Sequence, residues 1–458
     1  MENNIERDSI KYPEVNSSYL YRIVITISIG GFLFNFVSST MTVGILFLKE
    51  YFKLSPAMAG FVMGSVKLGS ILGPVLGLWL ADYWGRNKSM MISAWCIFIS
   101  AIGCALSLTV WDLILWRFIT GIGVGLIMVV APIYIAELSP SHMRSSLVNI
   151  NQLAIVIGII IAIFTDYLLS FNGYWRLMFA SAAIPSLLLI IGLIFTPKSP
   201  RWLALKNKTS EALNILSAIN GRQRAQFEIN QIMQSLRHDT GNIKELLKPG
   251  IKFSIYIGIG LMVFSQINGI NMMLSYGPAI LMGTGISSPS DAILHTLPNY
   301  ILILIATILS FKLISKYPRK VLLVSTVSCM AFANFLMGLV LYFKMPATVL
   351  LVPMLIGVIS FTVGFAPLTW VIVSEIFPTN IRGKAMAVVG IFLHGASYVC
   401  LWVFPVLTDF FDKYYNSTAG VFWIFTAICF ICVLFAWKLV PETKGLSLEE
   451  ISEFWNKK

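Results

Sequence analysis

Amide side chains gather in one apolar stretch of the chain, over residues 264–271. Gln266 and Asn271 lie on either side of Gly269, and a membrane helix interrupted near that glycine would let both amides face one cavity. Each amide offers hydrogen-bond donors and acceptors, so the pair could hold the hydroxyl groups of a small ligand. The alternative is interhelical packing, for which membrane helices also use small and amide side chains. The residues alone leave both interpretations open.

A second chemical pattern is a set of charged motifs that occurs twice. Residues 137–144 match residues 375–382 at every charged and proline position, 238 residues apart along the chain. The loop at 82–88 has a looser counterpart at 315–320. One such ion pair would indicate a solvated helix end, because exposed pairs contribute only about 0 to 1 kcal/mol. Repetition instead indicates two homologous halves, and such repeats place a substrate site between halves that rock against each other.

The elements that must position these residues are membrane-spanning helices. The 458-residue chain is 57% hydrophobic and 12% charged, with a mean hydropathy of +0.81, which excludes a water-soluble globule, a disulfide-rich scaffold and a disordered regulator. A span needs about 20 apolar residues. We therefore predict an all-α membrane protein with two pseudo-symmetric six-helix bundles. The twelve predicted spans are 21–47, 57–81, 89–110, 113–136, 147–170, 175–196, 251–282, 292–315, 321–343, 347–374, 384–409 and 419–440.

The only long polar interruption falls between the sixth and seventh spans. It divides the chain into an N-terminal six-helix bundle, a cytoplasmic linker, a C-terminal six-helix bundle and a cytoplasmic tail, at 1–196, 197–250, 251–440 and 441–458. Apolar residues recur at helical spacing among charges at 210–219 and 224–237. We therefore expect short amphipathic helices on the membrane surface within the linker.

The net charge of +12 follows from membrane topology and does not indicate nucleic-acid binding. About 26 of the 33 Lys and Arg residues lie on the side that holds both termini and the linker, as the positive-inside rule requires of a cytoplasmic face. We expect a multi-pass protein of the plasma (cell inner) membrane with both termini cytoplasmic. The six cysteines lie within or at the ends of spans, so we expect them to be small core residues.

Motifs for catalysis are missing from the sequence. The four histidines are scattered, and no metalloprotease, serine-hydrolase or nucleotide-binding motif is present, so we expect no enzymatic activity, no cofactor and no bound metal. An ion channel would need pore-lining charge rings or filter carbonyls, and the spans show no sign of either.

The motifs resemble those of the sugar porter family of the major facilitator superfamily. The resemblance includes both charged repeats, the segment from Ser199 to Leu203 at the start of the linker and the segment from Pro441 to Gly445 near the end of the chain. It is nearest to the bacterial pentose and hexose porters. The resemblance implies the major facilitator fold and transport of a small neutral sugar or polyol by alternating access. Membrane lipids are the other expected partners, and we expect a monomer.

The resemblance also implies roles for particular residues. The family places sugar contacts at the positions of Gln266 and Asn271, and Trp370 could stack on the C–H face of a sugar from a tenth span broken by glycine and proline. Further candidates for the binding site are Ser265, Ser275 and His394. A charged network is expected to close the cytoplasmic side in the outward-facing state. Its members are Asp82, Arg86, Glu137, Arg144, Glu375 and Arg382, with Arg117 as an intramembrane gating cation.

The coupling mechanism is open at this point. In the proton-coupled relatives an aspartate of the first span lies near the arginine that corresponds to Arg117, and here Val37 takes its place. The missing carboxylate favours facilitated diffusion. The alternatives are a proton symporter with a non-standard acid, for which Asp166 is a candidate, and a sugar sensor that binds without transport. Lys67, inside the second span, either snorkels outward or has a functional role.

Overall fold

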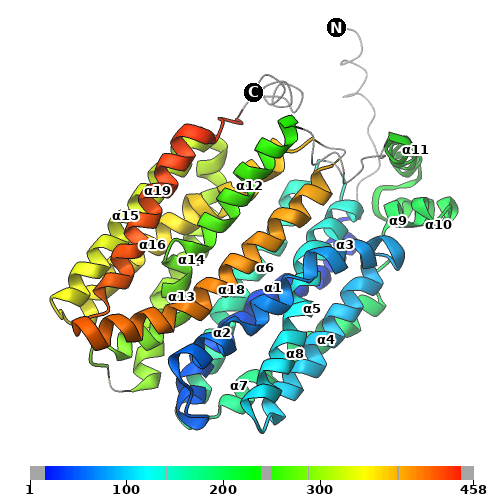
Figure 1. Cartoon of the computed structure of the whole chain (residues 1–458). Coiled ribbons are helices and arrows are strands. Elements are labelled where there is room, and N and C mark those ends of the chain that lie inside the picture. The colour runs from blue at the N-terminus through cyan, green and yellow to red at the C-terminus, as the bar shows by residue number, and fades with distance from the viewer. Residues whose placement is uncertain (1–15, 141, 239–248, 287, 379–380, 445–458) are drawn as a thin grey trace.

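The computed structural model describes residues 16–140, 142–238, 249–286, 288–378 and 381–444. These residues form a bundle of helices (Figure 1), and twelve helical segments are long and apolar enough to cross a membrane, which confirms the predicted number of spans. The segments are Ser17–Tyr51, Pro56–Tyr83, Arg86–Leu106, Val110–Leu138, Arg144–Ser170, Trp175–Ile194, Ile251–Met282, Pro289–Lys316, Arg319–Tyr342, Ala347–Ile376, Arg382–Tyr415 and Ala419–Leu439.

The first six spans are built from helices α1 to α8, of which α2 with α3 and α7 with α8 share one span each. Their bounds are α1 Ser17–Tyr51, α2 Pro56–Ser70, α3 Gly73–Tyr83, α4 Arg86–Leu106, α5 Val110–Leu138, α6 Arg144–Ser170, α7 Trp175–Ser181 and α8 Ala183–Ile194. The last six spans have the bounds α12 Pro249–Ile267, α13 Ile270–Met282, α14 Pro289–Lys316, α15 Arg319–Tyr342, α16 Ala347–Ser360, η3 Phe361–Phe365, α17 Ala366–Ile376, α18 Arg382–Tyr415 and α19 Ala419–Leu439.

Two of the predicted helix interruptions are confirmed. Gly269 separates α12 from α13 and has a φ of +88°, a left-handed conformation that L side chains rarely adopt. In the tenth span a π-helical turn, Phe361–Phe365, separates α16 from α17 and contains Gly364, with Pro367 in the first turn of the helix that follows. At the Gly269 break side chains take up freed backbone groups, since Asn268 Oδ1 accepts from the N–H of Ile270 and Asn334 Nδ2 donates to the carbonyl of Asn268.

The two groups of six spans lie side by side and meet along two helix pairs (Figure 1). Helix α2 packs against α18, and α6 packs against α14. The pairing relates the second span to the eleventh and the fifth to the eighth, as expected for two similar halves of six spans each. The division into domains remains a prediction, and residues 445–458 of the tail lie outside the described residues.

Helices in the linker match the predicted amphipathic segments. They are α9 (Pro200–Leu205), α10 (Thr209–Asn220) and α11 (Arg222–His238), and they share a small core of their own. The backbone N–H of Asn16, just before α1, donates to the carbonyl of Ile219 at 2.9 Å. The linker therefore lies at the end of the molecule where the first span begins, while residues 239–248 of the linker lie outside the described residues.

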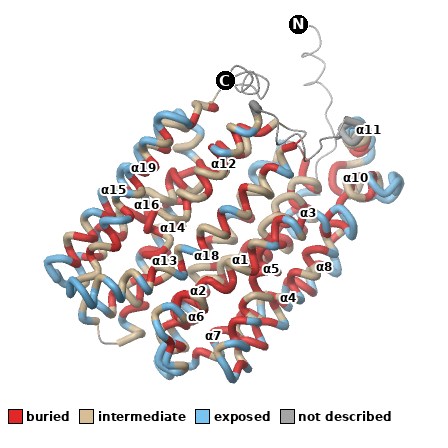
Figure 2. Tube along the Cα trace, viewed as in Figure 1, coloured by how far each residue is buried: buried red, intermediate tan, exposed pale blue. Residues whose placement is uncertain are grey.

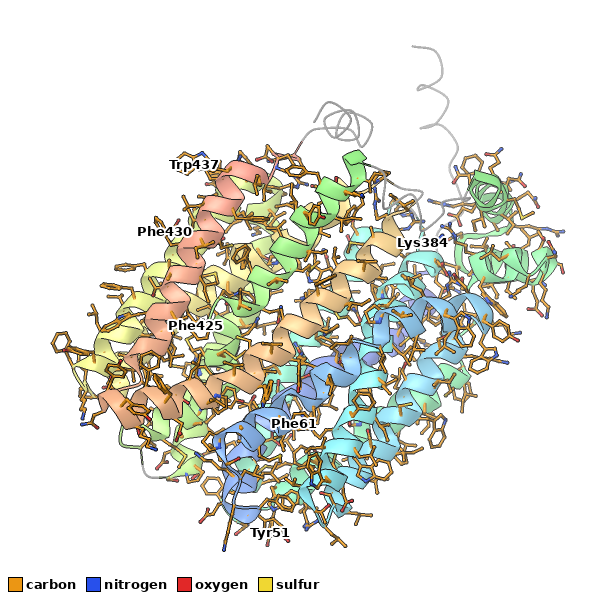
Figure 3. The ribbon with its side chains drawn as sticks, viewed as in Figure 1. Tyr51, Phe61, Lys384, Phe425, Phe430 and Trp437 are labelled. Atoms are coloured by element: carbon orange, nitrogen blue, oxygen red, sulfur yellow. The ribbon has the colours of Figure 1, made fainter. Side chains whose placement is uncertain are left out.

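Exposed apolar side chains cover the outside of the bundle, and buried residues line its inner faces (Figure 2). On α19, Phe430 and Trp437 are 61% and 67% exposed, and they point away from the neighbouring helices, whereas Phe425 is 4% exposed and points inward (Figure 3). An outward apolar face suits contact with lipid chains, which replace water around a spanning helix.

Glycines bring α2 very close to α18. A Cβ on Gly60 would lie 2.3 Å from the carbonyl oxygen of Trp402, and a Cβ on Gly64 would lie 2.8 Å from the ring of Tyr398. Helix α2 begins, and α18 ends, on the membrane side opposite the linker. The contact therefore closes that side, which the predicted topology makes the outer side.

Replacement of Gly60 by alanine is expected to disfavour this closed contact. One added methyl group would press on the backbone of α18, and overpacking of this kind costs about 1–3 kcal/mol. We expect about a tenfold slower exchange of substrate across proteoliposome membranes, since tenfold corresponds to about 1.4 kcal/mol. Gly395→Ala in α18 is the matched control, because nothing lies within 4 Å of its Cβ. Equal slowing in both variants would show that the Gly60 contact is not needed for transport.

Candidate functional site

A cavity of about 260 Å³ lies between the two groups of six spans. Its wall is mixed, with amide, hydroxyl and cationic side chains set among apolar ones. The polar residues come from α1, α2, α5, α6, α13, α14, η3 and α18 and from the end of α12; they are Asn35, Ser38, Ser39, Thr42, Lys67, Arg117, Gln152, Gln266, Asn271, Ser275, Tyr300, Thr307, Thr362 and Ser397. A space of this size, just below the range of about 300 to 1,000 Å³ typical of ligand pockets, suits a small polar solute.

The break at Gly269 places two predicted binding residues together. Asn271 Nδ2 donates to Gln266 Oε1 at 3.2 Å and to the carbonyl of Ser265 at 2.9 Å. Gln266 Nε2 in turn donates to Ser265 Oγ at 3.1 Å. Both amides line the cavity, which confirms the prediction that they face one space. Asn268 stabilises the break, because its side chain donates to the carbonyls of Phe264 and Ser265.

The other predicted binding residues fall into two groups. Ser275 lines the cavity, whereas Ser265, Trp370 and His394 are not among the residues of its wall. The hydroxyl of Ser265 is buried and donates to the carbonyl of Met262 at 2.6 Å, so it supports the Gln266 amide from behind. Trp370 is half-buried and packs against the main hydrophobic core. His394 is 1% exposed, and both of its ring nitrogens lack a hydrogen-bond partner among the described residues.

Several residues of the cavity wall were not predicted. Gln152, on α6, faces the cavity across from the α12–α13 break, and Asn35 and Tyr300 contribute from α1 and α14. Gln152 belongs to the segment 151–153, which forms part of the family resemblance, so a signal for it exists in the sequence. Asn35 and Tyr300 belong to no comparable motif. Their place in the cavity wall is known only from the packing of α1 and α14 in the structure.

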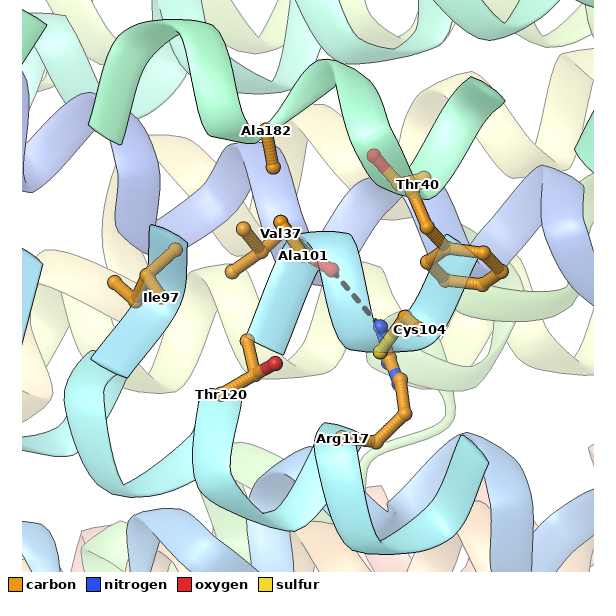
Figure 4. A pocket seen from close by; sticks show the side chains of 9 residues that line it. Val37, Thr40, Ile97, Ala101, Cys104, Arg117, Thr120 and Ala182 are labelled. Atoms are coloured by element: carbon orange, nitrogen blue, oxygen red, sulfur yellow. Dashed lines mark hydrogen bonds between the residues drawn. The ribbon is translucent and has the colours of Figure 1, made fainter. Parts of the chain in front are cut away.

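Two cations take part in the cavity wall. Lys67 lines the cavity and lies with its Nζ 5.5 Å from the centre of the Phe34 ring, so it does not snorkel to the outer surface. Arg117 is 2% exposed, and its Nη1 donates to the carbonyl oxygen of Val37 at 3.2 Å (Figure 4). Its Nε has no hydrogen-bond partner among the described residues. The side chain of Val37 offers this guanidinium only methyl groups, so the backbone alone satisfies it here.

Asp166 is the one described carboxylate that is completely buried within a span without a partner. It is 0% exposed, and neither carboxylate oxygen has a hydrogen-bond partner among the described residues. It interacts electrostatically with Tyr300 of α14, which packs against α6. Tyr300 lines the cavity and donates to the carbonyl of Leu274 at 3.1 Å. Asp166 lies about two helical turns beyond the cavity-lining Ile159 on α6 and is not itself among the residues of the wall.

The first copy of the charged motif forms a compact cluster at the linker end of the bundle. Arg86 Nε lies 2.9 Å from Glu137 Oε2, and Arg86 Nη1 lies 3.3 Å from Asp82 Oδ1. The hydroxyl of Ser199 donates to Glu137. Trp202 donates from its indole N–H to the carbonyl of Asp82 at 3.1 Å, so residues at the start of the linker complete the cluster.

The second copy forms a similar cluster with different members. Arg319 Nη2 lies 2.8 Å from Glu375 Oε1, and the hydroxyl of Thr443 donates to Glu375 Oε2 at 2.6 Å. Glu442 accepts the backbone N–H groups of Arg319 and Lys320, each at 3.0 Å. Arg319 is thus the main cation of this cluster.

The predicted network differs from the structure in two respects. Among the described residues, Arg144 and Arg382 form no ion pair; Arg382 instead lies 3.4 Å from the carbonyl of Phe377. The ion pairs of Arg86 and Arg319 each join residues within one group of six spans and do not bridge the two groups. In this conformation the clusters fix the helix ends of each half, since the two halves meet along α2–α18 and α6–α14. Arg117, predicted as a gate, lies in the cavity wall.

Comparisons with known proteins show extensive similarity. A model of the sugar (and other) transporter family matches residues 23–455. An arabinose-proton symporter of Bacillus subtilis (strain 168) is 35% identical, over 97% of this chain and 97% of that protein. A D-xylose-proton symporter of Escherichia coli (strain K12) is 34% identical, over 96% of this chain and 97% of that protein. The inward open conformation of the xylose transporter XylE from E. coli matches with a TM-score of 0.83 and 32% identity, covering 95% of this chain and 100% of that one.

Proposed function

The chain belongs to the sugar (and other) transporter family, and on that premise we propose that it carries a monosaccharide-sized, polyhydroxylated solute across the membrane together with a proton. Family membership and the structural match confirm the resemblance to the sugar porters and the major facilitator fold. The chain is a multi-pass membrane protein of a transporter family and not an enzyme. The finer points that follow are proposals.

Hydrogen bonding to hydroxyl groups is what the cavity offers a solute. Gln266, Asn271 and Gln152 present amides, and Ser275 and Thr362 present hydroxyls, to one space of about 260 Å³. Such side chains donate and accept, as a sugar hydroxyl does. The Gln266–Asn271 hydrogen bond holds the two amides ready and lowers the cost of ordering them when a solute binds.

The buried carboxylate of Asp166 is the observation that carries the proton coupling. An ionised carboxylate without a counter-charge is expensive inside a membrane, so Asp166 is expected to be protonated in this conformation. A conformational change that admits water to α6 and α14 would let the proton leave. The relatives named above as proton symporters support coupling of this kind.

Alternating access would use the two ends of the bundle differently. The α2–α18 contact closes the side opposite the linker, and the match to an inward open conformation agrees with that arrangement. We propose that the Arg86 and Arg319 clusters stabilise the helix ends that come together when the linker side closes. We also propose that this side is cytoplasmic, with both termini there, that the protein lies in the cell inner membrane, and that the monomer is the transporting unit.

Facilitated diffusion is the second candidate, and the environment of Arg117 favours it. Where the sequence comparison with proton-coupled relatives expects an aspartate near this guanidinium, the structure has the methyl groups of Val37. Coupling through Asp166 would have to work without an ion pair to Arg117. Facilitated diffusion would need no titrating carboxylate at all.

Uptake into proteoliposomes distinguishes these functions. Labelled pentoses, hexoses, polyols and sugar acids are offered with and without an inward proton gradient. We expect one class of solute to accumulate only with the gradient and to carry protons inward with it. Equilibration of a solute to the same level with and without the proton gradient would establish facilitated diffusion. Binding of a solute without any flux would identify a sensor.

A further inference from the structure

The cavity wall carries a net positive charge. Lys67 and Arg117 both line it, and none of the other residues in its wall is an aspartate or a glutamate. Asp166, on α6, is not among the residues of the wall. The solute therefore meets two cations and no anion within the described part of the cavity.

Both cations lack a protein counter-charge. Among the described residues, the Lys67 ammonium has a contact with the Phe34 ring but no hydrogen bond and no ion pair. Arg117 has one hydrogen bond, to the Val37 carbonyl, and stacks on Phe179 with its Cζ 5.6 Å from the ring centre. Its Nε remains without a partner. Charges buried within a membrane span are costly and normally have a partner, so a partner is expected to enter the cavity.

Nearby polar groups do not supply that partner. His394, on α18 beside α2, interacts electrostatically with Lys67, but an imidazole carries either no charge or a positive one. Cys104, beside Arg117, is a buried thiol. An anion brought by the solute would instead accept hydrogen bonds from the ammonium and the guanidinium at once, as carboxylates do.

We propose that the solute of this transporter is a monosaccharide-sized polyhydroxy carboxylate, such as a hexuronate or an aldonate, whose carboxylate lies against Lys67 and Arg117. The inference rests on the proposed function and replaces the neutral solute that the sequence predicts. Its hydroxyl groups would meet the amides of Gln266 and Asn271 in the same cavity. A monocarboxylate moved with one proton adds no net charge, so transport would be insensitive to membrane potential.

Matched pairs of ligands test this directly. D-glucuronate and D-glucose differ only in whether one terminal carbon is a carboxylate or a hydroxymethyl group, and D-galacturonate and D-galactose form a second such pair. Their affinities for the purified full-length protein are measured by titration calorimetry, which needs no proton gradient. We expect each acid to bind about 10- to 100-fold more tightly than its neutral partner, because hydrogen bonds to charged groups are the stronger ones.

Variants at Lys67 separate charge from shape. Lys67→Met removes the ammonium and keeps most of the side-chain length, so it should lower the acid-to-neutral affinity ratio severalfold, chiefly by weakening binding of the acid, while Arg117 remains in the wall. Lys67→Arg keeps the charge and should keep the preference. Lys413→Met makes the same change at an exposed position near the outer end of α18, and should have no effect.

The outcomes are distinguishable from failure of the proposed function. Tighter binding of the neutral sugars than of the acids would overturn the carboxylate proposal, and so would an unchanged acid-to-neutral affinity ratio in Lys67→Met. Neither result would contradict sugar transport. Binding of a sugar phosphate but not of the carboxylates would also overturn it, in favour of a different anion. If none of these solutes binds, both the carboxylate proposal and the proposed function are overturned.

Discussion

Replacement of Asp166 by asparagine is expected to abolish accumulation driven by a proton gradient. The asparagine has nearly the same shape and carries no charge in any state, so it cannot bind or release the coupling proton. With an inward gradient of one pH unit and no membrane potential, a one-to-one symporter can concentrate its solute about tenfold, since one unit corresponds to about 1.4 kcal/mol. We expect the wild-type protein to approach that ratio and Asp166→Asn to stop near equal concentrations on both sides.

Exchange of labelled for unlabelled solute at equal pH provides the second half of this experiment. Exchange requires the cavity and the alternating movement but no net proton transfer, so Asp166→Asn should retain it. Asp291→Asn, at an exposed position in the first turn of α14, is the matched control and should accumulate solute normally. Normal accumulation by Asp166→Asn would mean that the buried carboxylate is structural and would favour facilitated diffusion. Loss of exchange together with accumulation would indicate a damaged fold.

The spans could be predicted from the sequence because hydrophobic length is a local property. A bilayer-crossing helix needs about 20 apolar residues wherever it lies in the bundle, and the twelve predicted spans overlap the twelve helical segments of the structure. The break at Gly269 was also predictable, because glycine beside amides has a local cost in a helix. The division of the second span at Ile71 and Leu72 was not predicted, although Pro74, in the first turn of α3, marks it in the sequence.

The site was predictable only in part, because a cavity is made by helices far apart in sequence. Gln266 and Asn271 belong to one short segment, and the local break alone places both on the same side. The positions of Trp370 and His394 relative to the cavity depend on the rotation of α17 and α18, which no local pattern fixes. The clusters at the linker end show the same limit. Sequence repetition placed Glu137 and Glu375 at corresponding positions, but the arginine that pairs with Glu375 is Arg319 and not Arg382.

Asn271→Ala is expected to weaken solute binding strongly while leaving the protein folded. Asn271 lines the cavity, and its amide already holds Gln266 in place through a hydrogen bond of 3.2 Å. The substitution removes one direct contact with a solute hydroxyl and releases the Gln266 amide, which must then be ordered when the solute binds. Each such hydrogen bond contributes about 1 kcal/mol, and leaving a buried partner unsatisfied costs about 1–3 kcal/mol. The dissociation constant should therefore rise about 5- to 150-fold.

Titration calorimetry with the transported solute measures this effect, and a thermal unfolding curve shows whether the fold is intact. Asn230→Ala makes the same change on the exposed face of α11, far from the cavity, and should bind like the wild type. Ser265→Ala refines the test, because its hydroxyl supports the Gln266 amide without lining the cavity. A smaller loss than in Asn271→Ala is expected there. Unchanged affinity in Asn271→Ala would place the solute elsewhere in the cavity, whereas a larger loss in Ser265→Ala would mean that the serine itself contacts the solute.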